Sequence, residues 1–192
     1  MSAFSKQQGQ VLLRLARMTI MSKFGQHVSS SEDEALQKAL ADPAFQSTKG
    51  VFVTLTIGKQ LRGCIGNLAA SSNVLEGVKR NALNAAFNDY RFMPLSQEEL
   101  PEVTIEISVL TAPLPLKFSG PDDLIAKLRP GVDGVILHLG TASATFLPQV
   151  WEQLPKTEEF LGHLCQKAGL SSVAWQLNEI GIETYQVQHF SE

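Results

Sequence analysis

Hydrophobic and polar residues alternate along several short stretches of the chain, a pattern typical of half-buried β-strands. Residues 51–57 alternate in this way and are rich in β-branched side chains. The pair Gly58-Lys59 comes next and predicts a two-residue hairpin turn. We therefore expect residues 60–65 to return as the partner strand, with Gly66 and Asn67 leaving it.

Further strands follow in the second half of the chain. Residues 103–109 alternate with a polar outer face, as strands of antiparallel sheets do. Residues 134–139 and 141–147 predict a second hairpin around Gly140. Residues 182–190 predict one last strand.

Apolar residues at helical spacing, preceded by capping residues, predict the helices. The first helix carries Val11, Leu12, Leu15 and Met18 on one face and ends near Gly25. The other helices are expected from a Ser31–Glu34 capping box to Leu40, from Ser71 or Ser72 to about Asn88, from Pro121 to Leu128 and from Thr157 to Gly169, with a short turn capped by Ser96 and Glu99. Hairpins interspersed with helices favour the α+β class, with antiparallel sheets and flanking helices.

The composition is that of one ordinary globular domain spanning residues 1–192, alone or with a smaller lobe: 44% of residues are hydrophobic and 18% charged. A net charge of -3 disfavours binding along a nucleic-acid backbone. No apolar run approaches the roughly 18 residues that span a membrane. Residues 1–31 are basic and free of acids, like a mitochondrial presequence, but their helical spacing favours a domain helix.

The densest candidate chemistry lies between Leu61 and Gly66, where Gly63 and Gly66 flank Cys64. Glycines inside a strand indicate a bulge or a close backbone approach, and a bulge would expose the thiol. Arg62 lies two residues from Cys64, so in a regular strand its guanidinium shares a face with the thiol and favours the thiolate. The alternative is that Cys64 is a small buried hydrophobe.

A second candidate lies just after the expected helix that ends near Asn88. Asp89 and Arg91 are two residues apart, beside an aromatic residue. Arg91 would offer a donor fork to an anionic ligand, or the pair would hold the connector to the sheet. Both interpretations stay open at this point.

The remaining candidates are weaker. Phe146 and Trp151 flank Pro148 and indicate a packed corner. The four histidines, His27, His138, His163 and His189, form no metal-binding motif, and no nucleotide-binding or hydrolase motif occurs. The sequence therefore predicts no metal site and identifies no cofactor. Cys64 and Cys165 are expected to be free thiols of a reducing cytoplasm, with Cys165 in the core.

Several blocks, in order along nearly the whole chain, resemble the AMMECR family, named for the Alport syndrome, mental retardation, midface hypoplasia and elliptocytosis chromosomal region. The similar segments are the opening helix at 12–17, the signature LRGCIG at 61–66, the element Asp-x-Arg-Phe-x-Pro at 89–94, the segments 96–101 and 107–110, and the last block at 134–135 and 145–150. One departure is that residues 154–157 stand where members often carry a Trp, and Trp151 lies slightly earlier.

The resemblance implies a larger and a smaller lobe with a cleft near the signature, in a cytosolic protein. Prokaryotic members are called AmmeMemoRadiSam system protein A, which implies a Memo-type protein and a radical S-adenosylmethionine protein as partners. Two hypotheses follow. In the favoured one, a ligand-binding or adaptor module acts with these partners in modification of a biomolecule and uses Arg62, Gly63, Gly66, Asp89 and Arg91 to hold a partner or small anion. In the alternative, Cys64 is the nucleophile or redox thiol of an enzyme.

Overall fold

The computed structural model describes residues 3–26, 29–68 and 72–192. It confirms the α+β class, with two antiparallel four-stranded sheets and flanking helices. The helices are α1 (Lys6–Lys23), α2 (Ser30–Leu40), α3 (Val74–Phe87), α4 (Pro121–Lys127) and α5 (Thr157–Lys167). The strands are β1 (Val51–Ile57), β2 (Gln60–Asn67), β3 (Val103–Leu110), β4 (Leu114–Pro115), β5 (Gly134–Leu139), β6 (Ala142–Phe146), β7 (Gly181–Tyr185) and β8 (Val187–Ser191).

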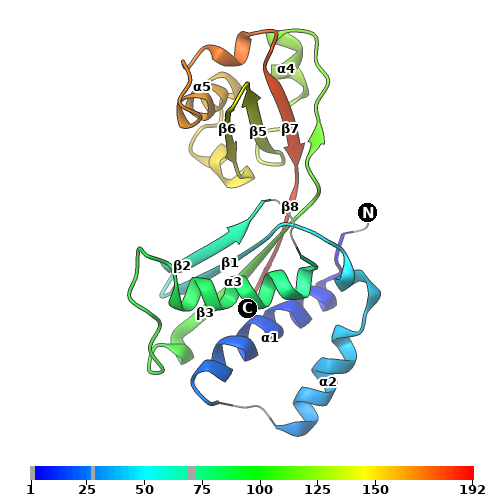
Figure 1. The fold of residues 1–192 in the computed structure, drawn as a ribbon, viewed down its shortest axis with the longest axis vertical. Helices are drawn as coiled ribbons and strands as arrows, with labels where there is room; N and C mark the ends of the chain where they lie inside the picture. The colour runs from blue at the N-terminus through cyan, green and yellow to red at the C-terminus, as the bar shows by residue number, and fades with distance from the viewer. Residues whose placement is uncertain (1–2, 27–28, 69–71) are drawn as a thin grey trace. The chain divides into compact units, whose positions relative to one another are not determined.

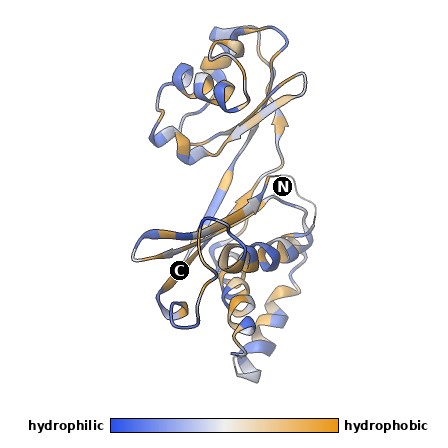
Figure 2. Cartoon of the chain, turned by 60° about the vertical axis from the view of Figure 1, so that its left-hand side comes forward, coloured by the Kyte–Doolittle hydropathy of each residue, from blue (hydrophilic) through white to orange (hydrophobic). Residues whose placement is uncertain are grey.

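The chain divides into two compact units. The first comprises residues up to Leu110 together with Gln188–Glu192, and the second is the continuous segment Thr111–Val187. Figure 2 shows hydrophobic and hydrophilic residues interleaved along the helices and strands, as amphipathic elements around a core require. Each unit has its own cluster of buried apolar side chains, so each is described separately.

The first unit is built on the sheet β2-β1-β3-β8. Helices α1 and α3 pack against each other and against this sheet (Figure 1). Val53, Leu55, Ile105 and Ile107 alternate along β1 and β3 and are fully buried in the core that includes these helices. The expected amphipathic alternation is therefore present, and β2 is left at one edge of the sheet.

The hairpin that carries the cysteine forms at the predicted turn. Gly58 and Lys59 both adopt positive φ, of 56° and 68°, as a turn matching the strand twist requires. The partner strand is longer than expected, because β2 continues through Gly66 to Asn67. Gly66 faces Phe52 across the pair, and the Phe52 ring occupies the space where a Cβ would lie.

A β-bulge interrupts the pairing of β1 with β2 at Arg62. Leu55 pairs with Gly63 whereas the next residue, Thr56, pairs with Leu61, so Arg62 is the extra residue. The bulge that the glycines indicated is thus present. It breaks the regular alternation, so Arg62 and Cys64 cannot be placed on one face by counting residues.

Two predicted helix caps are wrong by a few residues. The box at the start of α2 is formed by Ser29 and Glu32, whose carboxylate accepts from the Ser29 N–H at 3.1 Å, rather than by Ser31 and Glu34. Helix α3 is capped by Asn73, which accepts from the Glu76 N–H at 2.9 Å, and not by Ser72; Ser71 lies outside the described residues. Neighbouring Ser, Asn and acidic residues satisfy the same motif, and packing selects among them.

The second unit is built on the sheet β4-β7-β5-β6, with α4 and α5 beside it (Figure 1). The hairpin of β5 and β6 turns at Gly140 as predicted, with φ of +59°. The corner after β6 is packed: Trp151 stacks on Phe160 at 3.6 Å and donates Nε1–H to the Asp133 carbonyl at 2.7 Å. Cys165 is fully buried in this core, as expected.

The predicted last strand, residues 182–190, is in fact two strands in different sheets. Strand β7 ends at Tyr185. The Thr111 N–H then donates to the Gln186 carbonyl, and the Gln186 N–H donates to Thr111 Oγ1, both at 2.9 Å. Strand β8 then joins the sheet of the first unit. Alternation continues through Gln186, so the hydrophobic pattern carried no sign of the break.

Gly63→Ala is expected to destabilise the first unit. A Cβ at Gly63 would lie 2.1 Å from the Ala85 carbonyl oxygen of α3, and a helix backbone cannot yield cheaply. We expect a loss of about 1–3 kcal/mol in the free energy of unfolding, measured by urea denaturation. Gly77→Ala is the matched control, because its Cβ would meet Val51 at an ordinary 3.4 Å. A wild-type midpoint for Gly63→Ala would contradict the close approach.

Candidate functional site

The candidate site is centred on the peptide groups of Cys64 in edge strand β2. The Cys64 N–H donates to Asp89 Oδ2 at 2.9 Å, and the Cys64 carbonyl accepts from Arg91 Nη2 at 3.2 Å. Asp89 and Arg91 are themselves joined by two bonds, from Nε to Oδ1 at 2.9 Å and from Nη2 to Oδ2 at 2.7 Å. We call this arrangement the Cys64 clamp. It holds the connector to the sheet, which is one of the two interpretations left open above.

The clamp is buried on its acidic side and open on its basic side. The Asp89 side chain is 2% exposed and that of Arg91 is 42% exposed. The hydrogen bonds from Arg91, helped by those from the backbone of Cys64 and Arg91, hold the pKa of Asp89 well below its usual range. Asp89 is therefore a fixed anion at neutral pH, with no proton to exchange.

Arg62 does not pair with the thiol, contrary to the expectation from residue counting. Its guanidinium forms a bidentate ion pair with Glu99, at 2.7 Å from Nε and 2.9 Å from Nη2. Glu99 also closes the predicted turn, because its carboxylate accepts from the Ser96 N–H at 2.9 Å. These bonds, those from Arg62 first, lower the pKa of Glu99 to about 2.

The loop between these two ion pairs is held along its length. The Phe92 N–H donates to the Asp89 carbonyl at 3.0 Å, and the Leu95 N–H donates to the Ala86 carbonyl at 2.8 Å. The guanidinium carbons of Arg62 and Arg91 lie 6.0 and 5.5 Å from the centre of the Phe92 ring. We call residues 89–94, anchored in this way, the clamp loop.

The clamp loop exposes two large side chains to solvent. Tyr90 is 95% exposed and Met93 is 81% exposed. They occupy the two positions that the element Asp-x-Arg-Phe-x-Pro leaves open. The side chains of Asp89, Arg91 and Phe92, which the motif specifies, make the internal contacts described above.

The thiol of Cys64 is half-buried, and Thr54 Oγ1 donates to its Sγ at 3.2 Å. Thr54 is directly opposite Cys64 in the strand pair, so both lie on the face opposite the buried Leu55 and Val53.

The histidines lie apart from this thiol in the contacts they make. His138 Nε2 lies 3.8 Å from Glu183 Oε1 in the second unit, and His189 Nδ1 lies 3.0 Å from Ser108 Oγ. His27, in contrast, falls outside the described residues.

The six sequence-predicted residues thus meet around one strand, with different tasks. Cys64, Asp89 and Arg91 form the clamp, whereas Arg62 turns to Glu99. Gly63 admits the backbone of α3 and Gly66 admits the Phe52 ring, so both glycines serve packing inside the unit. Sequence reasoning found the cluster but missed the role of Glu99 and the exposure of Tyr90 and Met93.

Neither a metal site nor a membrane span appears in the described parts of the chain. Residues 3–26, 29–68 and 72–192 contain no group of three or more His, Cys, Asp or Glu side chains placed to hold a metal ion. Among the same residues, no helix is both long and apolar enough to cross a bilayer.

Comparison with known proteins identifies the family. The family model described as AMMECR1 matches residues 13–190. The chain belongs to the AMMECR1 family. An AMMECR1 relative from the archaeon Methanothermobacter thermautotrophicus is 37% identical over 98% of this chain and 96% of its own, and protein Ta0236 of Thermoplasma acidophilum is 37% identical over 96% and 87%.

A solved structure supports the fold described above. The crystal structure of uncharacterized protein PH0010 from Pyrococcus horikoshii matches with a TM-score of 0.78 and 31% identity, covering 98% of this chain and 93% of that one. The segment LRGCIG at residues 61–66 therefore lies on an edge strand of a fold that a solved structure shares. The names of these relatives state no activity.

The Arg62–Glu99 pair predicts a pH-dependent part of the stability. The pKa of Glu99 falls from 4.5 to about 2 on folding. The ionised carboxylate therefore contributes fully to the stability of the folded state above about pH 4.5, and this contribution is lost as pH falls toward 2. The side chain is 34% exposed, so solvent screening reduces the gain to about 1 kcal/mol.

Urea denaturation across this pH range checks the effect. Wild type should exceed Glu99→Gln in the free energy of unfolding by about 1 kcal/mol at neutral pH, with the gap closing in acid. Glu102→Gln is the matched control, since Glu102 has no ion-pair partner among the described residues. A gap that stays constant with pH would show that the Glu99 carboxylate does not contribute through its charge.

Proposed function

We propose that this AMMECR1 protein is a binding or adaptor module whose clamp loop docks a partner protein. The observation that carries the proposal is the exposure of Tyr90 and Met93 on a loop anchored at both ends. Tyrosine and methionine are enriched at the centres of protein interfaces, and tyrosine is common among the residues that dominate binding energy. A loop that is already ordered loses little entropy when its side chains are buried by a partner.

The charges of the site support docking over catalysis. Both guanidinium groups are neutralised inside the chain, Arg91 by Asp89 and Arg62 by Glu99. An activated thiolate needs a nearby base or an unpaired cation. The hydrogen-bond partner of the Cys64 thiol is instead the neutral Thr54 hydroxyl. The site thus offers a neutral, structured surface with two prominent apolar side chains.

The family resemblance supplies the candidate partners. A Memo-type protein and a radical S-adenosylmethionine protein accompany prokaryotic members in the name of the system. We propose that this chain presents the clamp loop to one of them during modification of a biomolecule, in the cytoplasm. A small anion is the less favoured ligand. Arg91 Nη1 has no hydrogen-bond partner among the described residues and could donate to an anion, but the adjacent Asp89 carboxylate neutralises the charge of the guanidinium.

The docking proposal predicts that Tyr90→Ala and Met93→Ala each weaken binding to the companion protein about tenfold or more. Isothermal titration calorimetry with the Memo-type and the radical S-adenosylmethionine protein from the same organism measures this. Both side chains are solvent-exposed, so the free energy of unfolding should change by less than about 0.5 kcal/mol.

Leu114→Ala is the matched control, because Leu114 is also exposed, at 67%, but belongs to the second unit. It should leave the affinity unchanged. Failure of the wild-type protein to bind either companion would remove the proposed partners. Binding that survives both loop substitutions would show that the partner docks elsewhere.

A second candidate function rests on the partial exposure of the Cys64 thiol. The half-buried Cys64 thiol is more accessible to chemistry than Cys165, which is fully buried and whose pKa is raised by that burial. In this alternative Cys64 is a nucleophile or redox thiol and the clamp positions its backbone.

Cys64→Ser separates the two functions. Docking through the clamp loop predicts that this variant binds the companion within about twofold of wild type, since the clamp uses only the backbone of residue 64. Alkylation read by peptide mass spectrometry should label Cys64 in the native protein and Cys165 only after unfolding. If Cys64→Ser kept its affinity for the companion but abolished an activity that the two proteins have together, the result would instead support Cys64 as a nucleophile or redox thiol.

A further inference from the structure

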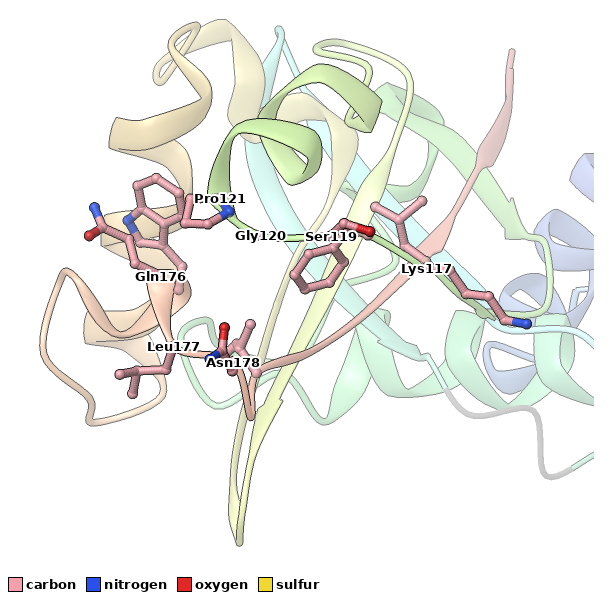
Figure 3. A pocket seen from close by; sticks show the side chains of 11 residues that line it. Lys117, Ser119, Gly120, Pro121, Gln176, Leu177 and Asn178 are labelled. Atoms are coloured by element: carbon pink, nitrogen blue, oxygen red, sulfur yellow. The ribbon is translucent and has the colours of Figure 1, made fainter.

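The second unit contains a pocket that the proposed function does not use. The ladder between β4 and β7 ends where the Leu116 N–H donates to the Ile182 carbonyl at 2.8 Å. Beyond this bond the segments 116–121 and 175–180 diverge, and a pocket of about 470 Å³ lies between them (Figure 3). This volume is in the range of sites for small ligands, roughly 300–1,000 Å³.

Apolar side chains contribute to the pocket lining, but polar backbone and side-chain atoms make up most of its surface. Trp175 and Ile180 are buried and line it, Phe118 is half-buried, and Leu177 is exposed. Figure 3 shows the Asn178 carboxamide pointing into the space between the two segments, whereas the Gln176 side chain points away from it. A carboxamide offers one acceptor and two donors, which match the edge of another amide.

The lining carries almost no charge. Lys117 is the one charged side chain among the lining residues, and it extends away from the pocket in Figure 3. Of the carboxylates next in sequence, Asp123 is paired with Lys127, whereas Asp122 and Glu179 have no ion-pair partner among the described residues. An anionic ligand is therefore disfavoured, and a neutral one fits.

Two backbone donors without an acceptor belong to the segments that border the pocket. Within the fully described stretch 72–192, the N–H groups of Phe118 and Asn178 have no hydrogen-bond acceptor. They lie on opposite sides of the gap that opens where the β4–β7 ladder stops. A bound group with carbonyl oxygens would satisfy donors that the sheet leaves free.

We propose that this pocket binds a neutral ligand that presents a planar amide beside an apolar or aromatic group. The amide would pair with Asn178 and with the unpaired N–H groups, while its apolar neighbour would contact Phe118 and Leu177. Two sources share this chemistry: a peptide segment and a free aromatic carboxamide. The site involves no residue of the clamp loop, so it is independent of the docking function.

Protein NMR with defined probes tests the proposal. Nicotinamide represents the aromatic carboxamide and N-acetyl-leucine methylamide the peptide unit. Each is titrated into the ¹⁵N-labelled full chain, with the backbone signals of Phe118, Ser119 and Asn178 as the readout. Ligands this small should bind with Kd of about millimolar. Nicotinate, which replaces the amide with a carboxylate on the same ring, is the charge control.

Asn178→Ala should weaken binding of the effective probe about three- to tenfold, the loss expected for one or two hydrogen bonds. Gln176→Ala is the matched control, because it removes an outward-pointing amide two residues away. Both residues are exposed, so both variants should fold, and their dispersed spectra will show it.

The outcomes are distinct. Tighter binding of nicotinamide assigns the pocket to a small carboxamide, and tighter binding of the blocked leucine assigns it to a peptide segment. Shifts spread over the whole surface, nicotinate binding as well as nicotinamide, or an Asn178→Ala variant equal to wild type would each overturn the proposal. None of these results bears on Tyr90 and Met93, so the docking function stands or falls separately.

Discussion

The backbone N–H and carbonyl of Cys64 point outward from the edge of a sheet. The N–H donates to the Asp89 carboxylate, and the carbonyl accepts from the Arg91 guanidinium. This interaction fixes much of the first unit. It seals part of an edge strand that would otherwise offer free backbone groups to another chain. It sets where the clamp loop begins, and the Arg62–Glu99 pair sets where the loop returns. Breaking the clamp by removing Arg91 would leave Asp89 buried without its charge partner.

The clamp also explains why glycines flank Cys64 in this chain. For Asp89 to reach the strand from the end of α3, that helix must lie close to β2, and Gly63 provides the closeness at the Ala85 carbonyl. The bulge at Arg62 then redirects that side chain to Glu99. The segment LRGCIG therefore supplies an edge strand, a close helix approach and one member of an ion pair.

Features encoded by neighbouring residues were predictable from the sequence. The Gly58-Lys59 turn, the hairpin at Gly140 and the Ser96–Glu99 box depend on residues within a few positions of one another. The cluster of candidate site residues was also found, through two short motifs. The Arg62–Glu99 pair was not, because its partners are 37 residues apart and nothing local joins them. The split of residues 182–190 was missed because membership of a sheet is a property of the whole fold.

The position of β8 has a consequence for how the chain folds during synthesis. The second unit is continuous, so it can fold as soon as it leaves the ribosome, whereas the first unit waits for residues made after it. Until β8 arrives, β3 is an unprotected edge. Glu192 then joins Ile105 and Arg17, and Gln188 joins Phe4, so the final residues close a sheet begun by the first half of the chain. The nascent first unit therefore carries an exposed strand edge until β8 has been synthesised.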